Sequence, residues 1–313
     1  MDTFIVSLLN GAVYGLLLFM VSAGLTLIFG MMGVLNFAHA SFYMLGAYFA
    51  YALEGMLGFW GALVASPLLV MATGVAIERY FLRRVHHHGH AHELLLTFGL
   101  AFICAELIKL FFGNYPVNYR IPQAIDFAAF TVGSVGYPAY RIFMAGIALA
   151  MFGLLYLMLT RTRVGIVVRS AIYKPRMVEA LGHNVPLVFM GVFGVGAGLA
   201  GLAGAVAGAF YTTNPNMALE LGAMVFVVVV VGGLGSLEGA MLASLLIGVV
   251  TSLAVSVDLS LADLLAHVGA RGWAEEVGGL LTLKLSSLAA TIPFALMLLV
   301  LLVRPSGLLG EKP

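Results

Sequence analysis

The stretch "FIVSLLNGAVYGLLLFMVSAGLTLIF", Phe4 to Phe29, decides the fold because it contains no charged side chain. A helix of about 20 apolar residues crosses the hydrocarbon core of a bilayer, and this run is long enough. No basic segment precedes it and no clean cleavage site follows it. We therefore interpret it as a retained membrane helix rather than a signal peptide.

The rest of the chain has the same character. Of its 313 residues 62% are hydrophobic and only 9% are charged, and the mean hydropathy is +1.07. Soluble domains are about 25% charged, so this composition indicates an integral membrane protein. The net charge of +1 gives no sign of a nucleic-acid partner, and Cys104, the only cysteine, excludes a disulfide framework.

Further apolar runs predict spans at 36–53, 60–82, 94–112, 141–160, 187–210 and 288–303. The region 219–256 is longer than one span and is broken at Gly232 to Ser236, so it predicts a short segment and a fuller helix. We expect an all-α, polytopic helical bundle of about nine membrane segments (eight to ten), forming one domain over residues 1–313. Every segment should be helical because backbone groups in lipid must be satisfied within the segment.

Basic residues set the orientation. Clusters follow the third, fifth and last spans, and nine segments place them all on one side, which should be the cytoplasm. The N-terminus then faces outward and the C-terminus inward. Residues 113–140 form an outside loop, and residues 257–287 are expected to form interfacial helices on the outer face.

A polar stretch, "VLNFAHASFYMLGAYFAY" (Val34 to Tyr51), stands among apolar residues. On a helix Asn36, His39 and Tyr43 share one face, and intramembrane polar groups usually face a cavity or another helix. This face could line a solute path. Alternatively, Asn36 caps the helix and His39 bonds a neighbouring helix.

The glycine-rich break after five valines also has two interpretations. Gly232, Gly233 and Gly235 could form a pore-lining discontinuity. They could equally form a cytoplasmic turn in which Ser236 caps the next helix.

Small residues four apart predict close helix packing. They occur in the first span and in "GVFGVGAGLAGLAGAVAGAF", which begins at Gly191. The candidate packing glycines are Gly11, Gly15, Gly194, Gly198, Gly201, Gly204 and Gly208.

A long inner loop, near residues 161–187, separates the fifth and sixth spans. Within it "RMVEALG" predicts a short amphipathic helix that ends at Gly182, with Met177, Val178 and Leu181 on one apolar face. A helix flanked by basic residues could anchor at anionic lipid or dock a soluble partner.

Four blocks of this chain, in order, resemble the branched-chain amino acid ABC transporter permeases of the LivH type. They are "LLNGAVYGLLLFMVSAGLTLIFGMMGVLNFAHASFYMLGAY", "RTRVGIVVRSAIYKPRMVEALGHNV", "GAGLAGLAGAVAGAF" and "VVVGGLGSLEGAMLASLLIG". The inner loop departs from the family pattern at His183, at Arg169–Ser170 and at Tyr173–Lys174. The resemblance therefore does not fix the details of coupling or the exact ATPase partner.

The resemblance implies a multi-pass permease of the bacterial inner membrane, which imports leucine, isoleucine, valine or related small amino acids and amides. It implies a second homologous permease, two ATP-binding subunits and an external solute-binding protein as partners. It also implies that the inner loop couples to the ATPases, with candidate residues Arg169, Glu179, Ala180, Gly182 and Asn184. The chain has no Gly-Lys pair and so no Walker A loop; it needs no cofactor, and ATP and magnesium belong to the partners.

The segment "VHHHGHAHE" (Val85 to Glu93) could place His86 and His90 one helical turn apart, a spacing that can bind zinc or nickel. We expect no metal site there, because Gly89 weakens the helix, and predict a soluble cytoplasmic loop.

Two rival functions remain. A single-subunit secondary transporter or channel would want buried carboxylates, and only Glu106, with Lys109 nearby, lies well inside a predicted span. An intramembrane metalloenzyme would want converging ligands, and a His-Glu-x-x-His motif is absent. Neither fits as well as a non-catalytic transport subunit.

Overall fold

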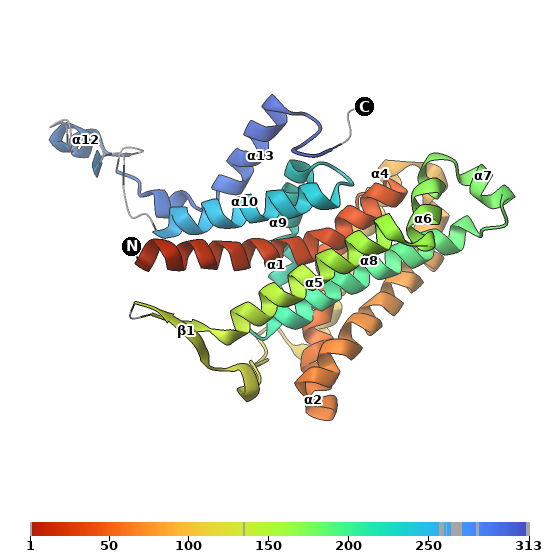
Figure 1. Ribbon diagram of the computed structural model, residues 1–313, viewed down its shortest axis with the longest axis horizontal. Coiled ribbons are helices and arrows are strands. Elements are labelled where there is room, and N and C mark those ends of the chain that lie inside the picture. Colours follow the sequence, from red (N-terminus) through yellow and green to blue (C-terminus); the bar gives the residue numbers. More distant parts are fainter. Residues whose placement is uncertain are drawn as a thin grey trace.

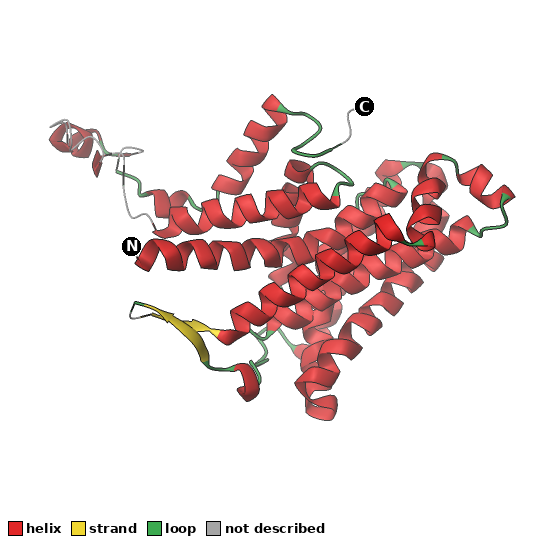
Figure 2. Ribbon diagram, in the orientation of Figure 1, coloured by secondary structure: helices red, strands yellow, loops and turns green. Residues whose placement is uncertain are grey.

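The computed structural model describes residues 2–133, 135–256, 260, 262–263, 271–279 and 282–310. Helices dominate it, as Figure 2 shows. The long helices are α1 (Asp2–Met32), α2 (His39–Ile77), α4 (His90–Phe112), α5 (Ala139–Arg161), α8 (Val185–Gly208) and α10 (Leu237–Ser256). Shorter helices are α3 (Arg83–Val85), α6 (Arg163–Tyr173), α7 (Pro175–Ala180), α9 (Met217–Gly232), α12 (Arg271–Val277) and α13 (Ile292–Val303). The single turns are η1 (Glu78–Leu82), η2 (His86–His88), η3 (Gln123–Ile125) and η6 (Leu285–Leu288).

Helix α2 is a hairpin of two arms. Its backbone leaves the helical conformation at Gly58, where φ is 68°. The Ser66 hydroxyl donates to the Gly46 carbonyl at 2.6 Å, although twenty residues of straight helix would separate the two by about 30 Å. The arms therefore fold back on each other and correspond to the predicted spans 36–53 and 60–82.

The apolar segments match the predicted spans in order. Within the described residues six helices are long and apolar enough to cross a membrane, if the continuous run His39–Val85 is counted once. Helices α9 and α13 are shorter and apolar. The multi-pass helical bundle is thus confirmed.

A β-hairpin corrects the all-α prediction. Strands β1 (Ala128–Val132) and β2 (Val135–Pro138) pair antiparallel within the segment predicted to be an irregular loop. Gly133, with φ of 61°, turns the chain, and the Phe130 and Tyr137 rings stack with centroids 5.1 Å apart. Alternating aromatic and β-branched residues around a glycine turn favour a hairpin. The prediction missed this pattern because most of the chain reads as membrane helix.

The predicted interfacial region 257–287 is partly described. It contains α12, on which Trp273 and Val277 are exposed, and the turn η6. The prediction for 257–259, 261, 264–270 and 280–281 lies outside the described residues.

The core is built on close helix approach around α8. Gly46 of α2 meets Gly201 of α8 backbone to backbone, and a Cβ on Gly204 would overlap the Tyr43 carbonyl. On the other side of the bundle Gly11 and Gly15 lie against the backbone of α10. The remaining predicted packing glycines all meet a neighbouring helix or loop within 3.2 Å of an added Cβ: Gly194, Gly198 and Gly208.

Figure 1 shows how the connections are distributed. The N-terminus, β1 and α12 lie toward one end of the bundle, and α6 and α7 lie at the other. This arrangement agrees with the predicted grouping of the outer and inner connections.

Candidate functional site

The polar stretch begins with a turn inside the bundle. Residues 33–38 are not helical, and α2 begins at His39. The His39 ring lies 2.9 Å from the carbonyl oxygen of Val21, about 16 Å back along α1 from its end at Met32. The chain therefore leaves α1, returns to mid-bundle depth and only then starts α2, in a segment we call the re-entrant turn (residues 33–38).

The structure corrects the placement of Asn36 on the helix face. Asn36 precedes the helix, and its Oδ1 accepts the Ala38 N–H at 3.0 Å. Asn36, His39 and Tyr43 are all buried. The helix begins after Ala38 without a side-chain cap, so Asn36 closes a local turn instead of capping the helix, whereas His39 makes the predicted bond to a neighbouring helix. The Asn36 amide nitrogen and His39 Nδ1 have no hydrogen-bond partner among the residues that the structure describes. Lining of a path by these residues stays a prediction.

The glycine break between α9 and α10 is a capped turn. Ser236 Oγ accepts the Gly239 N–H at 3.0 Å, as the turn interpretation predicts. Gly232 lies against Gly239, while Gly233, with φ of 103°, lies against Gly310 of the C-terminal segment. That segment is held by the N–H groups of Leu308 and Leu309, which donate to the carbonyls of Val231 and Gly232 at 2.8 and 3.0 Å.

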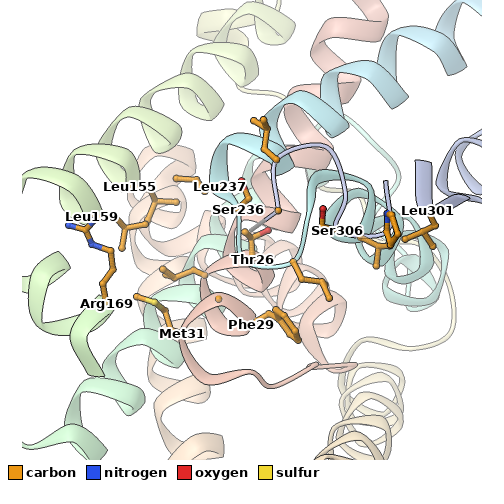
Figure 3. Close-up of a pocket in the computed structure, with 18 residues that line it drawn as sticks. Thr26, Phe29, Met31, Leu155, Leu159, Arg169, Ser236, Leu237, Leu301 and Ser306 are labelled. Carbon is orange, nitrogen blue, oxygen red and sulfur yellow. The ribbon is translucent and has the colours of Figure 1, made fainter. Parts of the chain in front are cut away.

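A cavity of about 630 Å³ lies beside this turn (Figure 3). It is lined by the ends of α1 and α5, by α6, by the α9–α10 turn and by the C-terminal segment. Gly235 is the only member of the predicted glycine trio that lines it, and Arg169 of α6 lies at its edge. Gly235, a predicted path residue, and Arg169, a predicted coupling residue, therefore line the same cavity at one end of the bundle.

The inner loop contains two helices rather than one. Helix α6, which was not predicted, is capped at its start by Thr162, whose Oγ1 accepts the Gly165 N–H at 3.2 Å. Helix α7 starts at Pro175, and Gly182 (φ of 88°) turns the chain after it, as predicted. Asn184 then caps α8 by accepting the Leu187 N–H at 3.0 Å.

We name residues 163–184, which contain the two helices, the coupling element after the role that the sequence predicts for them. This element has an apolar surface. The predicted apolar face divides: Val178 is buried against Ala171 and Val185, whereas Met177 and Leu181 are 60% and 74% exposed. A groove of about 550 Å³ runs between α6 and α7, lined by Ile166, Arg169, Ser170, Lys174, Met177, Val178 and Leu181. Glu179 and Ala180 are exposed beside it.

An unpredicted contact joins α3, which follows the α2 hairpin, to the start of α8. Arg83 Nη2 lies 3.2 Å from Oε2 of the buried Glu78 and donates to the Pro186 carbonyl at 2.8 Å. Pro186 lies in the first turn of α8, directly after the coupling element. The sequence separation of 103 residues explains why no local pattern could reveal the contact.

The histidine loop is organised by a carboxylate. His86 and His90 both bond Glu93, which is 1% exposed, through their Nδ1 atoms. They do not share one helix, because Gly89 (φ of 94°) separates η2 from α4. Among the described residues there is no group of three side chains able to hold a metal ion.

Comparison with known proteins completes these observations. A family model described as "Branched-chain amino acid transport system / permease component" matches residues 7–301. The chain is 28% identical to the high-affinity branched-chain amino acid transport system permease protein BraD of Pseudomonas aeruginosa, over 97% of this chain and 95% of that one. It is 27% identical to the LivH proteins of Salmonella typhimurium and Escherichia coli K12, over 98% of this chain and 96% of each of those. Among solved structures PsaBC from Streptococcus pneumoniae matches with a TM-score of 0.46 at 12% identity, over 95% of this chain and 91% of that one.

Proposed function

This chain belongs to the family of branched-chain amino acid transport permeases, and on that premise we propose that it forms one wall of an importer's solute path and transmits ATPase movement through residues 163–184. It is a non-catalytic, multi-pass subunit of the bacterial inner membrane without cofactors. The hydrolysis of ATP belongs to partner ATPases, and solute arrives from a binding protein.

The coupling element carries this proposal. It projects at one end of the bundle (Figure 1) and leaves Met177, Leu181 and Ile166 largely exposed. Exposed apolar patches rimmed by polar residues mark protein interaction sites. A groove between two short helices offers such a patch to an ATPase subunit.

The assembly we propose contains two permeases, two ATP-binding subunits and one external binding protein. Nine membrane segments place the N-terminus outside and the C-terminus in the cytoplasm. Asn36, His39 and Tyr43 are buried and support the residues that line the path. Gly232, Gly233 and Gly235 form the cytoplasmic end of the path.

The solute we propose is leucine, isoleucine, valine or a related small amino acid or amide. The relatives' printed names support the branched-chain class. A single-subunit secondary transporter or channel remains the second candidate, favoured only by Glu106, whose carboxylate pairs with Lys109 at 2.6 Å. That exposed pair offers no buried ion-coupling site.

The double variant Glu179→Arg/Leu181→Arg tests the proposal. Both residues are exposed on the coupling element, so the variant should fold and insert, yet fail to co-purify with the ATPase subunits. Uptake by the full complex should fall at least about tenfold, the equivalent of about 1.4 kcal/mol of lost docking energy. The control is Glu276→Arg, an exposed glutamate on α12 near the opposite end. Normal uptake and co-purification in the double variant would contradict the docking role.

A further inference from the structure

Helix α9 presents an exposed face within the bundle. Leu219, Glu220 and Ala223 are exposed, and Phe226, one turn further, is half-buried. The spacing of three residues places Glu220, Ala223 and Phe226 along one side of the helix. The opposite side, with Val225, Val228 and Val229, is buried.

The carboxylate of Glu220 lies at membrane depth rather than beyond the helix ends. A Cβ on Gly222, two residues away, would be 3.5 Å from the Cβ of Ala40. Ala40 follows His39, whose ring contacts the Val21 carbonyl in the middle part of α1. Glu220 is therefore close to the level of the first turns of α2, which begins at His39.

A water-filled passage explains this placement better than lipid does. No cation within 4.0 Å pairs with Glu220 in the described part of the chain. An unpaired carboxylate facing hydrocarbon is costly, and intramembrane charges almost always face a cavity or a bundle interior. The exposed face of α9 should thus border water.

Aromatic rings from three elements meet deeper along the same face. Phe226 is six residues beyond Glu220, about 9 Å further along α9. Its ring lies 4.8 Å from that of Phe37 in the re-entrant turn, and the Phe37 ring lies 6.2 Å from that of Phe98 on α4. We call Phe37, Phe98 and Phe226 the aromatic cluster.

The re-entrant turn holds Phe37 in place. The Phe37 N–H donates to Thr97 Oγ1 at 3.2 Å, which ties the turn to α4 beside Phe98. Although the flanking Asn36 and Ala38 are buried, Phe37 is 42% exposed and Phe98 is 51% exposed. The turn thus fixes an apolar ring at the edge of the exposed face.

We propose that this face of α9 is the chain's contribution to amino-acid selection in the path. Glu220 receives the ammonium group of the entering amino acid, and the aromatic cluster contacts its apolar side chain as it passes inward. The inference rests on the proposed function and adds to it the groups that recognise the solute. The re-entrant turn contributes to this face by positioning Phe37.

Cysteine accessibility tests the location of this face without relying on transport. Ala223→Cys, in a Cys104→Ser background, places a thiol between Glu220 and Phe226. A membrane-impermeant methanethiosulfonate should modify it at least about tenfold faster than a thiol in Leu154→Cys, since thiolates form in water and not in lipid. Leu154 is 71% exposed on the otherwise apolar outer face of α5, which makes it the lipid control. Modification of Ala223→Cys no faster than of Leu154→Cys would overturn the proposal, since the face would then contact lipid or another subunit.

Transport by the full complex tests selection. Phe226→Ala should change the uptake ratio of leucine to alanine at least about fivefold, while Phe111→Ala, a 76% exposed ring at the end of α4, should leave it unchanged. Glu220→Gln should lower leucine uptake about tenfold, because a charge-assisted bond to the ammonium group is lost. The selection role alone would be overturned if the wild-type complex is active, Phe226→Ala leaves the leucine-to-alanine uptake ratio unchanged and Glu220→Gln leaves the rate of leucine uptake unchanged. An inactive wild-type complex would instead contradict the proposed function.

Discussion

At the scale of single residues, the buried polar groups are engaged mainly with backbone. His39 bonds the Val21 carbonyl from a fully buried position. His39→Leu should therefore lower the Tm and the folded yield together, through loss of about 0.5–1.5 kcal/mol of hydrogen bonding. Uptake per folded molecule should be retained, and His88→Leu, at an exposed position, serves as the control. A loss of uptake at normal Tm would place His39 in the path.

A second residue-scale prediction concerns two glutamates on α4. Glu93 is buried and accepts from two histidines, whereas Glu106 is 68% exposed in its pair with Lys109. Glu93→Gln should lower the Tm clearly, because an amide offers a single oxygen to two donors. Glu106→Gln should change the free energy of unfolding by about 0–1 kcal/mol, as exposed pairs do. Equal Tm values for the two variants, measured in the same detergent, would contradict the structural role of Glu93.

The histidines of this loop are expected to matter for stability rather than for uptake. Replacing His86, His87, His88, His90 and His92 by serine should leave uptake per folded molecule within about a factor of two, because surface changes usually do little. The folded yield should fall, since Glu93 loses the partners His86 and His90. Uptake abolished at normal yield would indicate a proton or metal role.

At the scale of elements, the packing of α8 depends on missing side chains. Gly204→Ala would push a Cβ into the Tyr43 carbonyl, and the overpacking should cost about 1–3 kcal/mol. Gly191 lies on the same helix with nothing within 4 Å of an added Cβ, so Gly191→Ala is the matched control. The control should be neutral or stabilising by up to about 1 kcal/mol. Thermal unfolding of the two variants measures the difference in their stability. Equal stability would mean that α8 and α2 can move apart to accommodate the added methyl group without cost.

At the scale of the whole molecule, the sequence contains no phosphate-binding loop of the Walker A type. The purified chain should neither hydrolyse ATP nor accumulate leucine in liposomes. Both activities should appear when the two ATP-binding subunits, the second permease and the binding protein are supplied. Accumulation of leucine against a gradient by the isolated chain would contradict the ABC assignment.

The sequence by itself determined the features that depend on local composition. The length of the apolar runs predicted the membrane helices, and small-residue spacing predicted the packing stripe of α8. Local turn chemistry predicted the Ser236 cap and the turn at Gly182. Each of these depends on residues within a few positions of one another, where sequence patterns carry most information.

Only the tertiary structure decided which groups lie at the same depth and which face each one occupies. The re-entrant turn moved Asn36 off the predicted helix face, and the packing of α9 against α2 brought Gly222, two residues from Glu220, beside Ala40. The Arg83 contact with Pro186 joins positions 103 residues apart. Hydropathy measures only whether a segment prefers lipid, whereas the depth and facing of a side chain depend on packing between segments distant in sequence.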